Sequence, residues 1–94
     1  MSEQSQANLT HAEVRDAVIE VVAGISRIDP GDLENDVLIR EELGIDSLMA
    51  MEVVAACEKA LGISIDEGQL FCIETVGDFL DLVEQLYDSK PRSD

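Results

Sequence analysis

The most informative segment of this 94-residue chain is Leu43-Gly44-Ile45-Asp46-Ser47-Leu48. Aspartate is a residue type that caps helices, so we expect a helix from about Ser47 to Leu61 with Asp46 as its N-cap. Gly62 is the predicted stop, because glycine readily adopts the left-handed conformation that ends helices. Gly44 permits a tight approach of the chain to this helix. The segment therefore predicts a serine hydroxyl at the start of an apolar helix.

Two further long helices are predicted, one on each side of the central one. Thr10-His11-Ala12-Glu13 has the pattern of a capping box, and a helix should run from there to about Ile25. The last helix should start after Thr75, where Thr75-Val76-Gly77-Asp78 is a poorer capping box. Apolar residues recur at helical spacing in both helices: Val14, Val18, Val21, Val22 and Ile25 in the first, and Val76, Phe79, Leu80, Val83 and Leu86 in the last.

A long connection is predicted from about Ser26 to Asp46. Asp29-Pro30-Gly31-Asp32 is a turn signal that stops any helix, and the apolar residues scattered along the connection indicate that it packs. A short helical turn is expected near Asp66 to Phe71. The chain is therefore predicted to be an all-α bundle with three main helices, one short helix and a long first loop. We expect flexible tails at residues 1–9 and 88–94 around one domain at residues 10–87.

The composition predicts a folded chain with an acidic surface. Apolar residues make up 46% of the sequence and aromatic residues 3%, so aliphatic side chains must build the core. The net charge of −15 should repel nucleic acid and anionic membranes and attract basic protein surfaces. Met1 to Asn8 lacks the apolar stretch of a signal peptide and no segment approaches a membrane span, so we expect a cytoplasmic protein. Cys57 and Cys72 lie in apolar contexts and are expected to be two buried thiols.

The central helix carries two apolar faces. The predicted core face consists of Ala50, Val53, Val54, Cys57 and Leu61. The second face consists of Leu48, Met51 and Ala55, with Glu52 and Glu58 beside them. A helix that is apolar on two sides is either fully buried or offers one side to a partner, and we interpret the second face as a partner surface. The alternative is that Leu48 and Met51 fold down onto the long connection.

Ser47 lacks the partners of a catalytic serine. Its simplest role is that of a first-turn residue, and a nucleophile would need a base, whereas the sole histidine, His11, belongs to the first helix. The pattern G-x-S-x-G is absent, because Met49 stands where its second glycine would be. The spacing of His, Cys and Asp residues fits neither a zinc nor a calcium site. A modification site passes these tests, since a phosphodiester on Ser47 would meet the free N–H groups and positive dipole end of the helix.

The segment Leu43 to Leu48 resembles the L-G-x-D-S-L signature of the acyl carrier protein family, and the resemblance extends over about Thr10 to Leu86. It implies a four-helix carrier-protein bundle in which Ser47, flanked by Asp46 and Leu48, is esterified by 4′-phosphopantetheine. A phosphopantetheinyl transferase would donate this arm from coenzyme A, and the thiol of the arm would hold an acyl group as a thioester. The chain itself would catalyse nothing. It would be a monomer that docks on basic patches of acyl-transferring, condensing or tailoring enzymes.

Two departures from the family pattern bear on the pathway. Carriers of fatty-acid synthesis often have an acidic residue where Met49 stands, and Lys59 further reduces the acidity of that face. Both residues favour polyketide or other natural-product biosynthesis over a housekeeping fatty-acid role. Asp46 favours acyl cargo, because peptidyl carriers commonly have histidine there, and an aminoacyl or peptidyl carrier is the alternative. The alternative outside the class of carrier proteins is a non-catalytic acidic helical adaptor that only binds a basic protein. The polar ends favour a discrete protein over an excised module.

Overall fold

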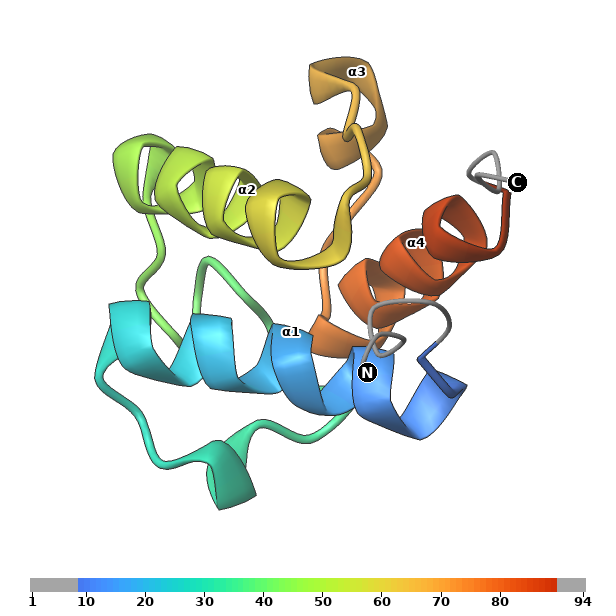
Figure 1. Ribbon diagram of the computed structural model, residues 1–94. Coiled ribbons are helices and arrows are strands. Elements are labelled where there is room, and N and C mark those ends of the chain that lie inside the picture. The colour runs from blue at the N-terminus through green and yellow to red at the C-terminus, as the bar shows by residue number, and fades with distance from the viewer. Residues whose placement is uncertain (1–8, 90–94) are drawn as a thin grey trace.

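The computed structural model describes residues 9–89, and this part of the chain is an all-α bundle, as predicted. Its elements are α1 (His11–Ser26), the 3-10 turn η2 (Pro30–Asp32), α2 (Ser47–Leu61), α3 (Glu67–Leu70) and α4 (Val76–Ser89). Helix α1 packs against both α2 and α4, and Figure 1 shows α1 and α2 side by side, running in opposite directions. The predicted tails fall largely on residues 1–8 and 90–94, which lie outside the described residues.

The bounds of α2 agree with the prediction at both ends. The Asp46 carboxylate accepts a hydrogen bond from the Met49 N–H at 2.9 Å, which makes Asp46 the N-cap. Gly62 has a φ of 67° and donates its N–H to the Glu58 carbonyl, which ends the helix. Helix α1 ends one residue later than predicted, at Ser26. Arg27 follows it with a φ of 62°, a left-handed conformation that a glycine adopts more easily.

Helix α4 begins with a capping box that the sequence marked as a poor one. The Thr75 hydroxyl accepts a hydrogen bond from the Asp78 N–H, and the Asp78 carboxylate accepts from the Thr75 and Glu74 N–H groups at 3.2 and 3.1 Å. Aspartate therefore reaches back far enough to replace the usual glutamate. These backbone donors, those of Glu74 and then Thr75, hold the pKa of the Asp78 carboxyl below its ordinary value.

The core is aliphatic and draws on all three long helices. Val14, Val18 and Val22 of α1 face Val53, Val54, Cys57 and Leu61 of α2 and Val76, Phe79, Leu80 and Val83 of α4 in one buried cluster. No polar or charged residue among 9–89 is buried. The other residues of the predicted stripes, Val21, Ile25, Ala50 and Leu86, are half-buried and pack against this cluster. None of the helices in the described part of the chain is long and apolar enough to cross a membrane.

The two ends of the described chain are tied together more closely than the predicted domain bounds suggest. Tyr87, rather than Leu86, completes the buried side of α4, and its hydroxyl accepts a hydrogen bond from the Leu9 N–H at 2.8 Å. The His11 imidazole lies 2.9 Å from the Asp88 carboxylate. Leu9 therefore packs on the bundle, and Asp88 belongs to α4, although the sequence placed both residues in the tails.

The long connection between α1 and α2 packs, as expected, and it is bonded to the start of α4. The N–H groups of Val76 and Gly77 donate to the carbonyls of Val37 and Asn35 at 2.9 and 2.8 Å. The Ile39 N–H donates to the Glu74 carbonyl at 2.9 Å. The predicted turn at Asp29 to Asp32 forms as η2, a single 3-10 turn capped by Asp29.

The two cysteines lie in different environments, so the prediction of two buried thiols was wrong for one of them. Cys57 is buried in the core, where desolvation and the nearby Glu58 carboxylate raise the pKa of its thiol to about 12. Cys72 is exposed and lies in the turn that follows α3, a helix of one turn. An apolar sequence context was therefore not sufficient to place Cys72 in the core.

We expect Gly77→Ala to lower the free energy of unfolding by about 1–3 kcal/mol. A Cβ at this position would stand 3.0 Å from the Asn35 carbonyl oxygen and 3.1 Å from the Asn35 Cβ. Gly24→Ala is the matched control, because a Cβ on this exposed residue of α1 would meet nothing within 4 Å. The control should raise stability by about 0.5–1 kcal/mol. Chemical denaturation followed by circular dichroism measures both, and equal effects would contradict the close approach.

We expect Asp78→Asn to lower the melting temperature at neutral pH and to have a smaller effect at acid pH. The folded-state pKa of Asp78 is depressed, so its ionised form stabilises the fold above the unfolded-state pKa, roughly 4. That stability is lost as the pH falls through the folded-state pKa. Asp81→Asn, an exposed position on the same helix, controls for the loss of one charge. If the difference in melting temperature between the two variants stayed constant on acidification, the charged cap would not contribute to stability.

Candidate functional site

Ser47 is the first residue of α2, and its side chain is exposed. The Met49 N–H donates to the Asp46 carboxylate and the Ala50 N–H donates to the Asp46 carbonyl at 2.8 Å. Within residues 9–89, the N–H groups of Ser47 and Leu48 and the Ser47 hydroxyl have no hydrogen-bond partner. Two free backbone donors therefore accompany an accessible hydroxyl at the positive end of the helix dipole.

The approach to Ser47 is fixed by a turn and an anchor. Gly44 has a φ of 69°, which glycine adopts without strain, and its N–H donates to the Arg40 carbonyl at 3.1 Å. Ile45 is buried and donates its N–H to the Ile39 carbonyl. Because Ile45 points into the core, the next residues, Asp46 and Ser47, are carried to the surface. The glycine and isoleucine of the segment thus present the serine.

The second face of α2 is open to solvent at most of the positions that the sequence singled out. Leu48 is 71% exposed and Met51 is 43% exposed, so they do not fold down onto the connection. Glu52 and Ala55 are also exposed. Together, Leu48, Met51, Glu52 and Ala55 form the outer face of α2, which lies next to Ser47 on the first turns of the helix.

Two residues of α2 behave differently from the expectation. Glu58 is half-buried, and its carboxylate accepts a hydrogen bond from the Ile65 N–H at 2.8 Å. It therefore holds the segment that follows α2, which limits its freedom to meet a partner. Met49 is half-buried and packs on the core, so its thioether contributes less to the outer face than its position in sequence suggested.

The sole histidine of the sequence does not lie near the serine. His11 is at the start of α1, and Figure 1 shows the starts of α1 and α2 at opposite ends of the bundle. Its imidazole instead faces Asp88. Among residues 9–89, no three His, Cys, Asp or Glu side chains come together in a group that could hold a metal ion. Ser47 thus has the exposure that suits modification and lacks the partner that a nucleophile needs.

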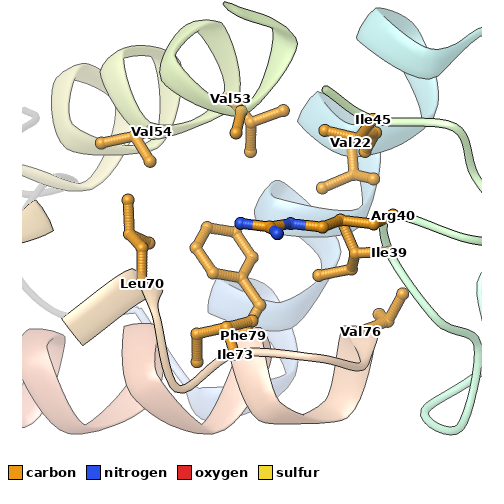
Figure 2. A pocket seen from close by; sticks show the side chains of 11 residues that line it. Val22, Ile39, Arg40, Ile45, Val53, Val54, Leu70, Ile73, Val76 and Phe79 are labelled. Atoms are coloured by element: carbon orange, nitrogen blue, oxygen red, sulfur yellow. The ribbon is translucent and has the colours of Figure 1, made fainter. Parts of the chain in front are cut away.

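An apolar pocket of about 90 Å³ lies on the inner side of α2. Its walls come from α1, α2, α4, the segment around α3 and the connection before Ser47, as Figure 2 shows. Ile45 and Ala50 line it, so it reaches the first turn of α2. Arg40 is the charged residue in its lining. The pocket could not be predicted from the sequence, because five separate segments build it and no local pattern marks them.

Comparison with known proteins identifies the class. The family described as "Phosphopantetheine attachment site" matches residues 16–83. An acyl carrier protein of Sulfurovum sp. is 37% identical over 71 residues, which cover 76% of this chain and 95% of the relative. The meromycolate extension acyl carrier protein of Mycobacterium tuberculosis is 25% identical over 85 residues, or 90% and 74% of the two chains. Acyl carrier protein 2, mitochondrial, of Arabidopsis thaliana is 31% identical over 85 residues, or 90% and 64%.

A helical bundle with an accessible serine at a helix start and a pocket behind it has the features of a carrier of a covalently bound group. This chain belongs to the phosphopantetheine attachment site family, as an acyl carrier protein whose cofactor is covalently attached 4′-phosphopantetheine. The start of α2 fits such a group. An exposed hydroxyl is available to form the ester, and the free N–H groups of Ser47 and Leu48 suit a phosphate oxygen.

Proposed function

We propose that Ser47 is the attachment point of 4′-phosphopantetheine and that the chain carries acyl intermediates as thioesters in polyketide or other natural-product biosynthesis. The observation that carries this proposal is the exposed Ser47 hydroxyl, which has no histidine beside it and, within residues 9–89, stands next to two unpartnered N–H groups. When bound, the arm supplies a terminal thiol for the thioester. The chain's own role is to present the arm, to shelter the cargo and to be recognised by enzymes, without catalysing a step itself.

The start of α2 favours a phosphate ester by local electrostatics. The free N–H groups of Ser47 and Leu48 and the helix dipole favour a negative charge by about 0.3–1 kcal/mol at an exposed site. The net charge of −15 opposes this over longer distances. Salt screens the long-range repulsion, with a Debye length of about 8 Å at physiological ionic strength, more than it screens direct hydrogen bonds. The helix end is therefore the part of this acidic surface best suited to the arm.

The pocket behind α2 is where we place the hydrocarbon part of the cargo. Its apolar walls include Ile45, Ala50 and Phe79, and it reaches the turn that carries Ser47. A dry cavity of roughly 150 Å³ accommodates benzene. A volume of about 90 Å³ therefore suits a chain of a few carbons without rearrangement. Longer chains would require α2 and α4 to move apart.

The outer face of α2 is the surface that we assign to partner enzymes. Leu48 and Met51 offer apolar contact next to Ser47, and Met51 has the flexible side chain that adapts to differently shaped surfaces. Glu52 and the overall charge would steer basic patches of a phosphopantetheinyl transferase and of acyl-transferring, condensing or tailoring enzymes. We expect Glu58 to contribute less to partner binding, because its carboxylate already accepts a hydrogen bond from the Ile65 N–H.

The pathway assignment rests on Lys59 and Met49, whereas Asp46 supports an acyl cargo over a peptidyl one. Lys59 is an exposed cation in the last turn of α2, which makes that surface less acidic than in a typical carrier of fatty-acid synthesis. Met49 supports the same assignment more weakly, since it is half-buried. The second candidate is fatty-acid synthesis, and the name of the mycobacterial relative refers to meromycolate extension. An aminoacyl or peptidyl cargo is the third, and loading assays with acyl and aminoacyl donors separate it from the two acyl candidates.

The proposal includes a cytoplasmic, monomeric carrier. One relative is mitochondrial by name, so fractionation of the producing cells tests the location. Sedimentation analysis tests the oligomeric state. A dimer or a non-cytoplasmic location would change these two details and leave the attachment at Ser47 standing.

Ser47→Ala is expected to abolish loading. We expect the wild-type protein, incubated with coenzyme A and a broad-specificity phosphopantetheinyl transferase, to gain the mass of one phosphopantetheine. The variant should gain none and remain folded, because Ser47 is exposed and the cap belongs to Asp46. Ser64→Ala, an exposed serine outside α2, is the control and should load fully. A folded wild-type protein that gains no mass would favour the acidic adaptor instead.

Met51→Glu is expected to slow transfer to and from partner enzymes by about tenfold while changing stability by less than about 0.5 kcal/mol. A carboxylate on the outer face of α2 removes apolar contact at the surface next to Ser47. Gln85→Glu adds the same charge at an exposed position of α4 and should transfer at the wild-type rate. Transferase kinetics and thermal melts measure both effects. An equal loss of rate in the two variants would assign the effect to net charge.

A further inference from the structure

Arg40 is the feature that the carrier role leaves unexplained. It lines the apolar pocket, and Figure 2 shows its side chain extended into the pocket with the guanidinium among Val53, Ile39 and Phe79. Within residues 9–89 this guanidinium makes no hydrogen bond or ion pair, whereas Arg15 pairs with Glu84. Arg40 is an exposed residue, so this planar cation with five donors is unpaired and open to solvent beside the pocket assigned to the cargo.

The acidic side chains nearby do not account for Arg40. Glu41 and Glu74 share with Arg40 the lining of a second hollow of about 320 Å³, beside the first. Neither carboxylate comes within ion-pairing distance of the guanidinium. Arg40 thus stands between a polar hollow and an apolar pocket, and its charge is directed into the apolar one.

We infer that Arg40 determines cargo specificity and that the pocket takes an acyl group ending in a carboxylate, the monothioester of a dicarboxylic acid. This inference rests on the proposed function, in that the cargo enters the pocket from an arm on Ser47. A purely hydrocarbon cargo would fill the apolar walls and leave the guanidinium partly desolvated without a partner, which is unfavourable. A carboxylate matches the guanidinium in charge and in its two-donor geometry.

The net negative charge of the chain is a second argument that Arg40 binds the carboxylate of the cargo. A carboxylate on the cargo would be repelled by a protein of net charge −15. From Glu41 to Asp88 the sequence contains one basic residue, Lys59, which is exposed at the far end of α2. Arg40, just before this acidic segment, is therefore the cation placed to offset the repulsion inside the pocket.

The test uses two cargoes of matched shape on the same arm. Glutaryl-coenzyme A, with ¹³C at its free carboxylate, and 5-methylhexanoyl-coenzyme A, in which methyl groups replace the two oxygens, are donors for a phosphopantetheinyl transferase. We expect the pKa of the glutaryl carboxyl, titrated by NMR, to be about one unit lower in the wild type than in Arg40→Gln, a tenfold change in proton affinity. Arg40→Lys should lie between them. The glutaryl cargo should also raise the wild-type melting temperature more than its methyl analogue does.

Arg27→Gln is the control, because it removes the same charge from an exposed residue that does not line the pocket. It should leave the carboxyl pKa close to the wild-type value. Equal pKa values in Arg40→Gln and Arg27→Gln would overturn the role of Arg40, and so would equal thermal effects of the two cargoes. Intact mass is measured first. No mass gain would overturn the proposed function, and this inference with it, whereas loading with equal pKa values overturns this inference alone.

Discussion

The first turn of α4 supplies the constraint on which the rest of the molecule depends. The N–H groups at the start of a helix have no partner within the helix, and here Val76 and Gly77 give theirs to the carbonyls of Val37 and Asn35. Each such bond contributes only about 1 kcal/mol. Together with the Ile39 bond to Glu74, they fix a connection whose regular structure is one turn of 3-10 helix and an isolated antiparallel bridge between Leu38 and Thr75. The connection in turn sets the position of Ile45, and Ile45 determines that Ser47 faces solvent.

Local signals in the sequence were sufficient for the helices. Asp46 and Gly62 bracket α2 because capping depends on residues a few positions apart. The capping boxes at Thr10 and Thr75 form for the same reason, and Asp78 shows that the pattern tolerates a shorter carboxylate. The exposed outer face of α2 also followed from helical spacing, since a narrow bundle buries only one side of a surface helix.

Features that depend on how the chain continues beyond a single helix did not follow from the sequence. Tyr87 takes the core position expected for Leu86, because its hydroxyl meets the backbone of Leu9, 78 positions away. Glu58 was interpreted as a surface charge, and only the course of the chain after α2 shows that it bonds Ile65. The pocket behind α2 is likewise built from five segments. Only their arrangement in the folded chain shows that Arg40 lines this pocket.

The burial of Cys57 has a chemical consequence for the thioesters that we propose this protein carries. A thiolate close to such a bond can take the acyl group by exchange, and Cys57 lies on the same helix as Ser47. With a pKa of about 12, fewer than roughly one in ten thousand of its thiol groups is ionised near neutral pH. Its side chain is also 1% exposed. The core can therefore contain a sulfur atom that fills space and leaves the cargo on the arm untouched.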